Sequence, residues 1–229
     1  MKKSLLSIAL TSLLATSAVV STQASAVEGL SANVAATSNY LWRGLEQTGG
    51  SAAISGGVDY AADSGFYAGT WASNASWGDM KTELDLYLGF GGDISENVSY
   101  DLGYIYFAYP DSAADENDFS EVYASISAGG FSFGVAVLAD SEAGGDGAEF
   151  GDSVYANIDY SIALESGAEI GLHIGDYSGD FSTDSTDLGI SISKDGFTFG
   201  VSKTSFSGEV SGDEEDMKFY VSYAVDIDL

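Results

Sequence analysis

The chain has 229 residues, and its 7 Lys+Arg against 35 Asp+Glu give a formal net charge of −28. That charge excludes a nucleic-acid binder, because phosphate backbones are held by lysine and arginine side chains. Aromatic residues make up 13% of the chain, which excludes a disordered acidic polypeptide. The absence of cysteine and the presence of one histidine exclude thiolate and multi-histidine metal sites, so we expect no cofactor and no resident metal.

Residues 1–26 have the pattern of a secretory signal peptide. Lys2 and Lys3 precede an apolar run over residues 5–20, and the small residues Ala24-Ser25-Ala26 follow as a cleavage site. The run is shorter than the roughly 20 apolar residues that a spanning helix needs. Cleavage after Ala26 removes two lysines and no acid, which makes the exported chain still more acidic. We expect residues 27–229 to form one domain.

From residue 30 onwards, apolar residues alternate with polar or small ones. Leu84, Leu86 and Leu88 alternate in this way, as do the apolar residues between Phe219 and Leu229. Period-two alternation predicts strands with one apolar face. We expect about twelve strands, near residues 30–43, 52–61, 65–74, 81–91, 98–109, 119–129, 131–139, 153–162, 168–177, 186–194, 197–206 and 217–229.

The links between these strands alternate in length. Short links of turn residues, such as Gly129-Gly130 and Asp195-Gly196, predict tight hairpins. The longer links are expected at residues 44–51, 75–80, 110–118, 140–152, 178–185 and 207–216. Short and long links at opposite ends, with an even number of strands, predict an all-β fold with an up-and-down antiparallel order.

Two closures share this pattern: a soluble sandwich or lipocalin-like barrel with apolar residues inside, and a transmembrane β-barrel with apolar residues outside. The polar face favours the membrane barrel, because it is dominated by Gly, Ser and Ala, which suit a narrow wet lumen. The aromatic residues also cluster beside the short turns, as an interfacial girdle at the periplasmic end would. Those residues are Tyr60, Phe66, Phe90, Tyr100, Phe131, Phe133, Phe197 and Phe199.

The long links hold many of the acidic residues. Such runs are typical of solvated loops, and none has the spacing of a calcium loop. The loops would still gather divalent cations weakly. They contain Asp111, Asp115, Glu116, Asp118, Asp140, Glu142, Asp146, Glu149, Asp180, Asp184, Glu209, Asp213, Glu214, Glu215 and Asp216.

Several motifs carry a family resemblance. Residues 38–44 (SNYLWRG), 56–60 (GGVDY), 65–69 (GFYAG), 83–87 (ELDLY) and 101–104 (DLGY), together with Gln47-Thr48 and Tyr109-Pro110, resemble in order the opening of the TorF-type porin family. The resemblance is specific over roughly the first half of the exported chain and architectural afterwards. It implies a Gram-negative outer-membrane β-barrel with a pore, and it supplies no substrate.

The alternation also predicts which polar residues face the lumen. Arg43 is the main inward cation on the expected first strand, and Asn33 and Asn157 share the inward face. The lumen-lining residues that we expect to set selectivity are Arg43, Asp59, Glu83, Asp85, Asp101, Glu121, Asp159, Glu169 and His173. Carboxylates in a narrow lumen concentrate cations, so the sequence predicts passive diffusion of small solutes with a preference for cations.

Three alternatives remain at this point. Arg43 would plug the barrel if it paired with the lumen acids, which would make a non-conducting structural barrel. The acidic loops would serve an adhesin. An outer-membrane enzyme would need a nucleophile near His173, but the chain has no Gly-x-Ser-x-Gly motif, so we expect no catalytic residue. The expected partners are outer-membrane lipids, lipopolysaccharide and the barrel-assembly machinery, which would read the C-terminal strand that ends at Leu229.

Overall fold

The computed structural model describes residues 28–112, 117–141, 148–179, 183–208 and 214–229. The predicted signal peptide therefore lies outside the described residues. So do several of the loop acids: Asp115, Glu116, Glu142, Asp146, Asp180, Glu209 and Asp213.

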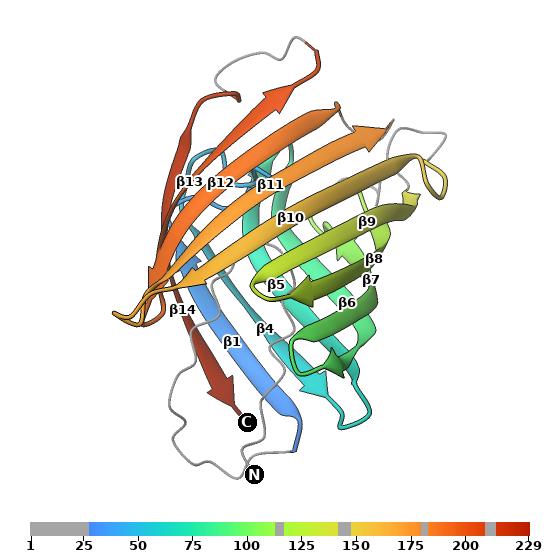
Figure 1. Ribbon diagram of the computed structural model, residues 1–229. Helices are drawn as coiled ribbons and strands as arrows, with labels where there is room; N and C mark the ends of the chain where they lie inside the picture. Colours follow the sequence, from blue (N-terminus) through green and yellow to red (C-terminus); the bar gives the residue numbers. More distant parts are fainter. Residues whose placement is uncertain (1–27, 113–116, 142–147, 180–182, 209–213) are drawn as a thin grey trace.

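The described chain forms a closed antiparallel barrel of twelve strands (Figure 1), which confirms the predicted all-β transmembrane-barrel class. Each strand pairs with its neighbour along the chain, and β1 closes the ring against β14, with Ser31 opposite Asp228 and Thr37 opposite Ser222. The barrel strands are β1 (Leu30–Thr37), β4 (Ala53–Ala61), β5 (Phe66–Trp77), β6 (Met80–Ser95), β7 (Val98–Ala108), β8 (Phe119–Ala128), β9 (Phe131–Ser141), β10 (Ser153–Ala163), β11 (Glu169–Gly179), β12 (Ser185–Lys194), β13 (Phe197–Phe206) and β14 (Lys218–Asp228).

The apolar face of the strands points outward. On β6, Leu88 and Phe90 are 50% and 52% exposed, whereas Glu83 and Asp85 are 2% and 4% exposed. A soluble barrel would have the opposite distribution, because apolar side chains leave water on folding. An apolar exterior is what contact with lipid requires, so this orientation decides between the two closures that the sequence allowed. No helix in the described ranges is long and apolar enough to cross a membrane.

Aromatic side chains pair across neighbouring strands at the end of the barrel that carries the short turns. The ring centroids of Phe66 and Phe90 are 5.4 Å apart, and those of Phe131 and Tyr160 are 4.3 Å apart. Phe197 and Tyr223 form a third pair at 4.5 Å. These pairs lie where the sequence predicts an interfacial girdle.

Both ends of the described chain lie at this same end of the barrel (Figure 1), where the Leu229 amide donates to the Leu30 carbonyl at 3.2 Å. One expectation about the opposite end is wrong. The link expected at residues 75–80 is only the two residues Gly78 and Asp79, because β5 and β6 continue to Trp77 and from Met80. The positive φ of Gly78, 59°, makes this tight reversal accessible.

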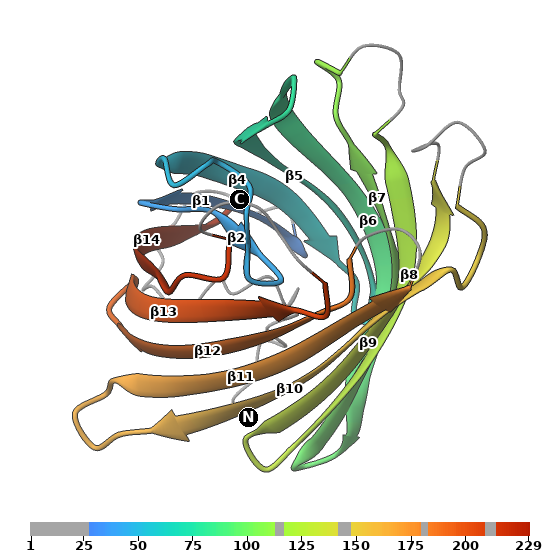
Figure 2. The same ribbon diagram turned by 90° about the horizontal axis from the view of Figure 1, so that it is seen from above.

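The predicted first strand is also too long. It ends at Thr37 rather than at residue 43, and residues 38–52 turn into the barrel. There they form a short hairpin, β2 (Leu41–Trp42) and β3 (Leu45–Glu46), which Figure 2 shows inside the ring of strands. Arg43 and Gly44, with φ of 51° and 76°, then reverse the chain inside the barrel, because these values do not belong to an extended strand.

Candidate functional site

The inner hairpin reverses at Arg43-Gly44. Two consecutive residues with positive φ between paired strands define a two-residue hairpin turn of the type I′ class. Glycine adopts this conformation freely, but an arginine there is disfavoured by about 1–2 kcal/mol. The position of Arg43 therefore needs compensation from the surroundings of its side chain.

The Arg43 guanidinium receives that compensation from the barrel wall. Its Nη1 and Nη2 donate to the two carboxylate oxygens of Glu121 on β8, at 2.7 and 2.6 Å. The guanidinium also lies over the rings of Trp42 and Tyr155, 4.3 and 4.4 Å from their centroids. The side chains of Arg43 and Glu121 are only 10% and 7% exposed, so a bidentate pair and ring faces replace water around the charge.

Gly44 brings the tip of the hairpin against the opposite wall. The Thr204 hydroxyl on β13 donates to the Gly44 carbonyl at 3.0 Å. A Cβ atom on Gly44 would lie 2.2 Å from the Thr204 Oγ1 and 2.8 Å from the Asp187 Cβ. Only glycine therefore fits both the backbone conformation and the space at this position.

Trp42 anchors the hairpin in an apolar cluster on the inner face. It meets Phe107 and Phe119 edge-on, with ring centroids 6.1 and 6.0 Å apart. Phe107 and Phe119 belong to a buried cluster on β7, β8 and β9 that includes Ile105 and Leu138. The sequence predicts a small and polar inner face, and this apolar cluster is an exception that the inner hairpin explains.

The base of the hairpin contacts a third part of the barrel wall, on β5 and β6. The Tyr40 hydroxyl donates to the Glu83 carboxylate on β6 at 2.7 Å, and its ring contacts Trp71 edge-on at 5.6 Å. Burial raises the pKa of Tyr40 well above its usual value, and the nearby charges of Glu83 and Asp85 raise it further. The pKa of Tyr109, just after β7, is raised by the same causes. Both phenols therefore stay protonated as hydrogen-bond donors.

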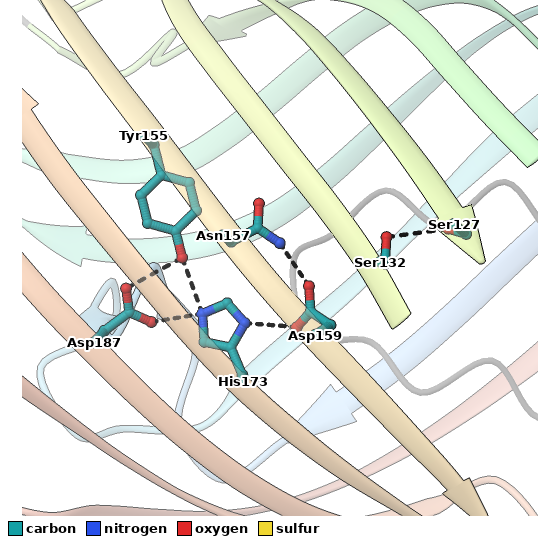
Figure 3. Close-up of polar contacts among 7 residues, drawn as sticks. All are labelled: Ser127, Ser132, Tyr155, Asn157, Asp159, His173 and Asp187. Atoms are coloured by element: carbon teal, nitrogen blue, oxygen red, sulfur yellow. Dashed lines mark hydrogen bonds and ion pairs between the residues drawn. The ribbon is translucent and has the colours of Figure 1, made fainter. Parts of the chain in front are cut away.

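His173 on β11 lies between two carboxylates. Its Nδ1 is 2.6 Å from Asp159 on β10, and its Nε2 is 2.9 Å from Asp187 on β12, as Figure 3 shows. The Tyr155 hydroxyl contacts the His173 Nε2 at 3.0 Å and donates to Asp187 at 3.1 Å. Both ring nitrogens face carboxylate oxygens, which only accept hydrogen bonds. Each nitrogen must therefore carry a proton to form its bond. Neither nitrogen is then available to accept a proton from a nucleophile.

Serine is absent from the described contacts of His173. The pair Ser127 and Ser132 lies apart from it in Figure 3, bonded to each other at 3.1 Å. Among the described residues, no group of three or more His, Asp and Glu side chains is arranged to hold a metal ion.

Two further inner acids, Asp59 and Asp101, are bonded to phenols and an amide. Asp101 accepts from the Tyr67 hydroxyl at 2.6 Å, and Tyr67 also bonds Tyr123 at 2.6 Å. Asp59 accepts from Asn33 at 3.2 Å and from Tyr87. Glu169 lies at the start of β11 near the short turns, where it is exposed and apart from the hairpin.

Three of the described loop acids accept hydrogen bonds from backbone amides. Asp118 accepts from the Tyr109 amide at 2.8 Å, and Asp184 accepts from the Gly179 amide at 3.0 Å. Glu215 accepts from the Phe206 amide at 3.0 Å.

Of the site residues expected from sequence, Arg43 meets Glu121, and His173 meets Asp159. Glu83 and Asp85 are buried near the base of the hairpin, while Asp59 and Asp101 belong to separate clusters. Asp187 was not among the expected residues, although it lies on the same face of β12 as Gly189 and Ser191. The residues expected to set selectivity also did not include the inner tyrosines, which alternate with the outward residues of their strands: Tyr67, Tyr87, Tyr123, Tyr155, Tyr177 and Tyr220.

The sequence from residue 21 to residue 227 matches the model of a bacterial family of unknown function, Gcw_chp. The chain belongs to the Gcw_chp family. No curated protein sequence matches it. Since the description of Gcw_chp names no function, the resemblance to TorF-type porins stays a prediction.

Solved outer-membrane barrels have a similar fold. The KdgM porin shares 11% identity at a TM-score of 0.50, over 87% of this chain and 99% of that one. OprD of Pseudomonas aeruginosa shares 12% at a TM-score of 0.40, over 88% and 68%. The outer membrane phospholipase A of Escherichia coli shares 12% at a TM-score of 0.47, over 85% and 88%. At these identities the likeness concerns the fold alone.

Proposed function

We propose that this protein is an outer-membrane channel for passive diffusion of small solutes and that its acidic lumen prefers cations. The inner hairpin of residues 38–52 is its constriction. The observation that carries the proposal is the composition of the inner contacts around that hairpin. Glu83, Asp85 and Asp187 are buried there, and Arg43 and His173, the basic side chains in the described contacts of this site, are each paired with acids. Lys218, at the start of β14, is a further buried basic residue on the inner face.

Charge near a constriction controls which ions enter. Arg43 is neutralised by Glu121, and His173 is flanked by Asp159 and Asp187, so each cation is at least balanced. The Asp59 carboxylate, bonded to Asn33 and Tyr87, adds negative charge without a basic partner in the described contacts. Fixed negative charge in a channel concentrates cations and repels anions. The polyanion in the name of one KdgM complex, oligogalacturonate, would be repelled by such a lumen.

The test is a planar-bilayer recording on purified protein in a salt gradient. We expect discrete conductance steps and a reversal potential that lies towards the equilibrium potential of the cation. Anion selectivity would refute the cation preference, and no conductance at all would refute the channel.

A non-conducting structural barrel is the second candidate, and the hairpin itself favours it. The hairpin contacts β6, β8, β10 and β13, which supports a closed lumen. The variant Arg43→Gly separates the two, because it removes the Glu121 pair while keeping a residue that accepts positive φ. If the wild type is closed, this variant gains conductance.

Asp195→Gly is the matched control. Asp195 has nearly the same φ, 52°, but lies in an exposed turn between β12 and β13. An equal gain of conductance in both variants would show that the effect is not caused by the hairpin.

We further propose export through the signal peptide of residues 1–26 and insertion by the barrel-assembly machinery into a bilayer with lipopolysaccharide. Heat-modifiable gel mobility in outer-membrane fractions is expected. Deletion of residues 226–229 is expected to leave the chain in the periplasm.

Weak binding of divalent cations and an adhesin role would both belong to the acidic loops, and trimming residues 140–152 or 207–216 tests them. His173→Ala is expected to change no esterase or protease activity.

A further inference from the structure

The tip of the inner hairpin, its turn at Arg43-Gly44, lies against two residues of the barrel wall. A Cβ atom on Gly44 would lie 2.8 Å from the Asp187 Cβ, so the backbone of the turn packs directly on Asp187. The Asp187 side chain is 4% exposed, and its carboxylate accepts from the Tyr155 hydroxyl at 3.1 Å. The Tyr155 ring in turn carries the Arg43 guanidinium, 4.4 Å from its centroid. Asp187 and Tyr155 are therefore the seat of the hairpin tip.

His173 contacts both residues of this seat. Its Nε2 is 2.9 Å from the Asp187 Oδ1 and 3.0 Å from the Tyr155 hydroxyl (Figure 3). Its Nδ1 is 2.6 Å from the Asp159 carboxylate. A doubly protonated imidazole donates to both carboxylates, and its positive charge compensates the buried charge of Asp187.

Loss of one proton from His173 removes this compensation. A neutral imidazole keeps one N–H and presents a lone pair at its other nitrogen, so it can donate to only one of the two carboxylates. Asp187 is then a buried carboxylate without a counter-charge, which is strongly unfavourable until water reaches it. Because the hairpin tip packs on Asp187, water reaches this carboxylate when the tip moves away.

Histidine suits such a switch near neutral pH. In water, carboxylates titrate near pH 4, histidine near pH 6.5 and phenols near pH 10, while arginine stays protonated. The titratable and charged groups that face His173 and its partners are Asp159 and Tyr155 on β10, Asp187 on β12, Arg43 on the hairpin, Glu121 on β8 behind Arg43, and Glu169 and Tyr177 on the same face of β11. Between about pH 6 and about pH 9.5, the imidazole is the group of this set that can change its charge.

We propose that His173 is a pH-sensitive latch for the inner hairpin. With both ring nitrogens protonated, it holds Asp187 and Tyr155 under the hairpin tip. When it loses a proton at alkaline pH, the tip leaves its seat. The wider lumen that follows matters for conductance only if the proposed channel function holds, whereas the movement of the hairpin does not depend on it.

The protonation of the latch is measured first. His173 is the only histidine of the chain, so protein that carries isotope-labelled histidine and no histidine tag gives one imidazole NMR signal. This signal is followed from about pH 6 to about pH 9.5. One titration step in this range is expected.

The position of the hairpin is measured with a thiol reagent. The chain has no cysteine, so Leu45→Cys beside the turn introduces a single thiol. Ser166→Cys, in the exposed turn between β10 and β11, is the reference, because any thiol reacts faster as the pH rises. The labelling rate at residue 45 relative to residue 166 should rise about tenfold or more, the effect of one lost hydrogen bond to a charged group. Its midpoint should coincide with the titration of His173.

Two matched substitutions are made in both cysteine backgrounds. Asp187 and Asp159 both contact His173, but of the two only Asp187 packs on Gly44 in the described contacts. Asp187→Asn leaves no charge under the tip, so the relative labelling rate should no longer respond to pH. Asp159→Asn should keep a response, at the pH where His173 titrates in that variant. His173→Gln has no titrating ring and should give a relative rate that is independent of pH.

The latch is overturned by a His173 signal that does not titrate, by a labelling rate that does not follow the titration, or by a pH response that survives in His173→Gln. The same proteins are recorded in bilayers, so the two proposals fail separately. Movement of the hairpin without conductance at any pH overturns the channel and leaves the latch. Conductance with an unchanged relative labelling rate overturns the latch and leaves the channel.

Discussion

Two hairpin turns in this barrel have almost the same backbone and opposite surroundings. Arg43-Gly44 has φ of 51° and 76°, and Asp195-Gly196 has φ of 52° and 83°. Asp195 is exposed in a short turn between two barrel strands, whereas Arg43 is buried inside the lumen against Glu121 and Tyr155. The turn geometry is therefore a local property, while the location of the turn depends on what its side chains can contact.

Reversing the charge at both turns should produce the largest difference. Arg43→Glu places a carboxylate beside Glu121 in a buried site, and breaking a buried pair costs about 3–5 kcal/mol. We expect the hairpin to leave its position, a lower unfolding temperature on heat-modifiable gels, and a larger conductance. Asp195→Lys, in water, should cost no more than about 1–2 kcal/mol, the penalty of placing a lysine at positive φ. Equal effects of the two reversals would contradict a special role of the inner turn.

Neutralising Glu121 tests the other partner of the inner turn. Glu121→Gln leaves the buried Arg43 charge without its counter-ion, at a cost of about 3 kcal/mol. The reversal potential should also move towards the equilibrium potential of the anion, because one negative charge is lost while the Arg43 charge is retained. Glu165→Gln, in the exposed turn between β10 and β11, should leave the reversal potential unchanged. A shift of the potential towards cations in Glu121→Gln would argue against a lumen location for this pair.

Replacing the glycine of each turn by alanine separates backbone strain from the collision of the added Cβ with its neighbours. Gly44→Ala and Gly196→Ala both force alanine into positive φ, which costs about 1–2 kcal/mol, so both should lose stability in urea titrations. At Gly44 the added Cβ would also collide with Thr204 at 2.2 Å, whereas at Gly196 it approaches the Ala224 carbonyl at 2.8 Å on the rim. Only Gly44→Ala should therefore change conductance. If Gly196→Ala changed it as strongly, the constriction would have to lie elsewhere.

The smallest effect is expected from one hydroxyl that holds the inner turn. Thr204 and Thr198 are both buried on β13, but only the Thr204 hydroxyl bonds the Gly44 carbonyl, while the Thr198 hydroxyl has no partner among the described residues. Thr204→Val should cost about 1 kcal/mol in urea titration, and Thr198→Val should be neutral or stabilising. The opposite order would mean that the bond from Thr204 does not hold the hairpin.

Much of the barrel could be predicted, because strand alternation and turn residues are local signals. The strands from β7 to β14 begin and end within about two residues of the predicted ranges, and the Asp195-Gly196 turn is where the sequence places it. The outward direction of Leu88 and Phe90 also agrees with the prediction, since the small residues on the other face cannot cover a water-exposed wall.

The inner hairpin could not be predicted in the same way. Tyr40 and Trp42 continue the outward positions of Val34 and Ala36, so the alternation does not mark the break after Thr37. Arg43-Gly44 lacks the Asn or Asp that usually signals such a turn, and its positive φ is compensated by Glu121, 78 residues later in the chain. Asp187 was missed for a similar reason, because its contact with His173 depends on the register between β11 and β12.

The sequence by itself determined an all-β chain, the near-complete set of strands, an acidic character and one apolar face on each strand. These follow from residue periodicity and composition, which act over a few neighbouring positions. Only the tertiary structure decided that residues 38–52 enter the lumen, that Arg43 is neutralised there, and that His173 and Asp187 meet beside the tip of the hairpin. Those features arise from side chains that are distant in sequence and meet only when the barrel closes.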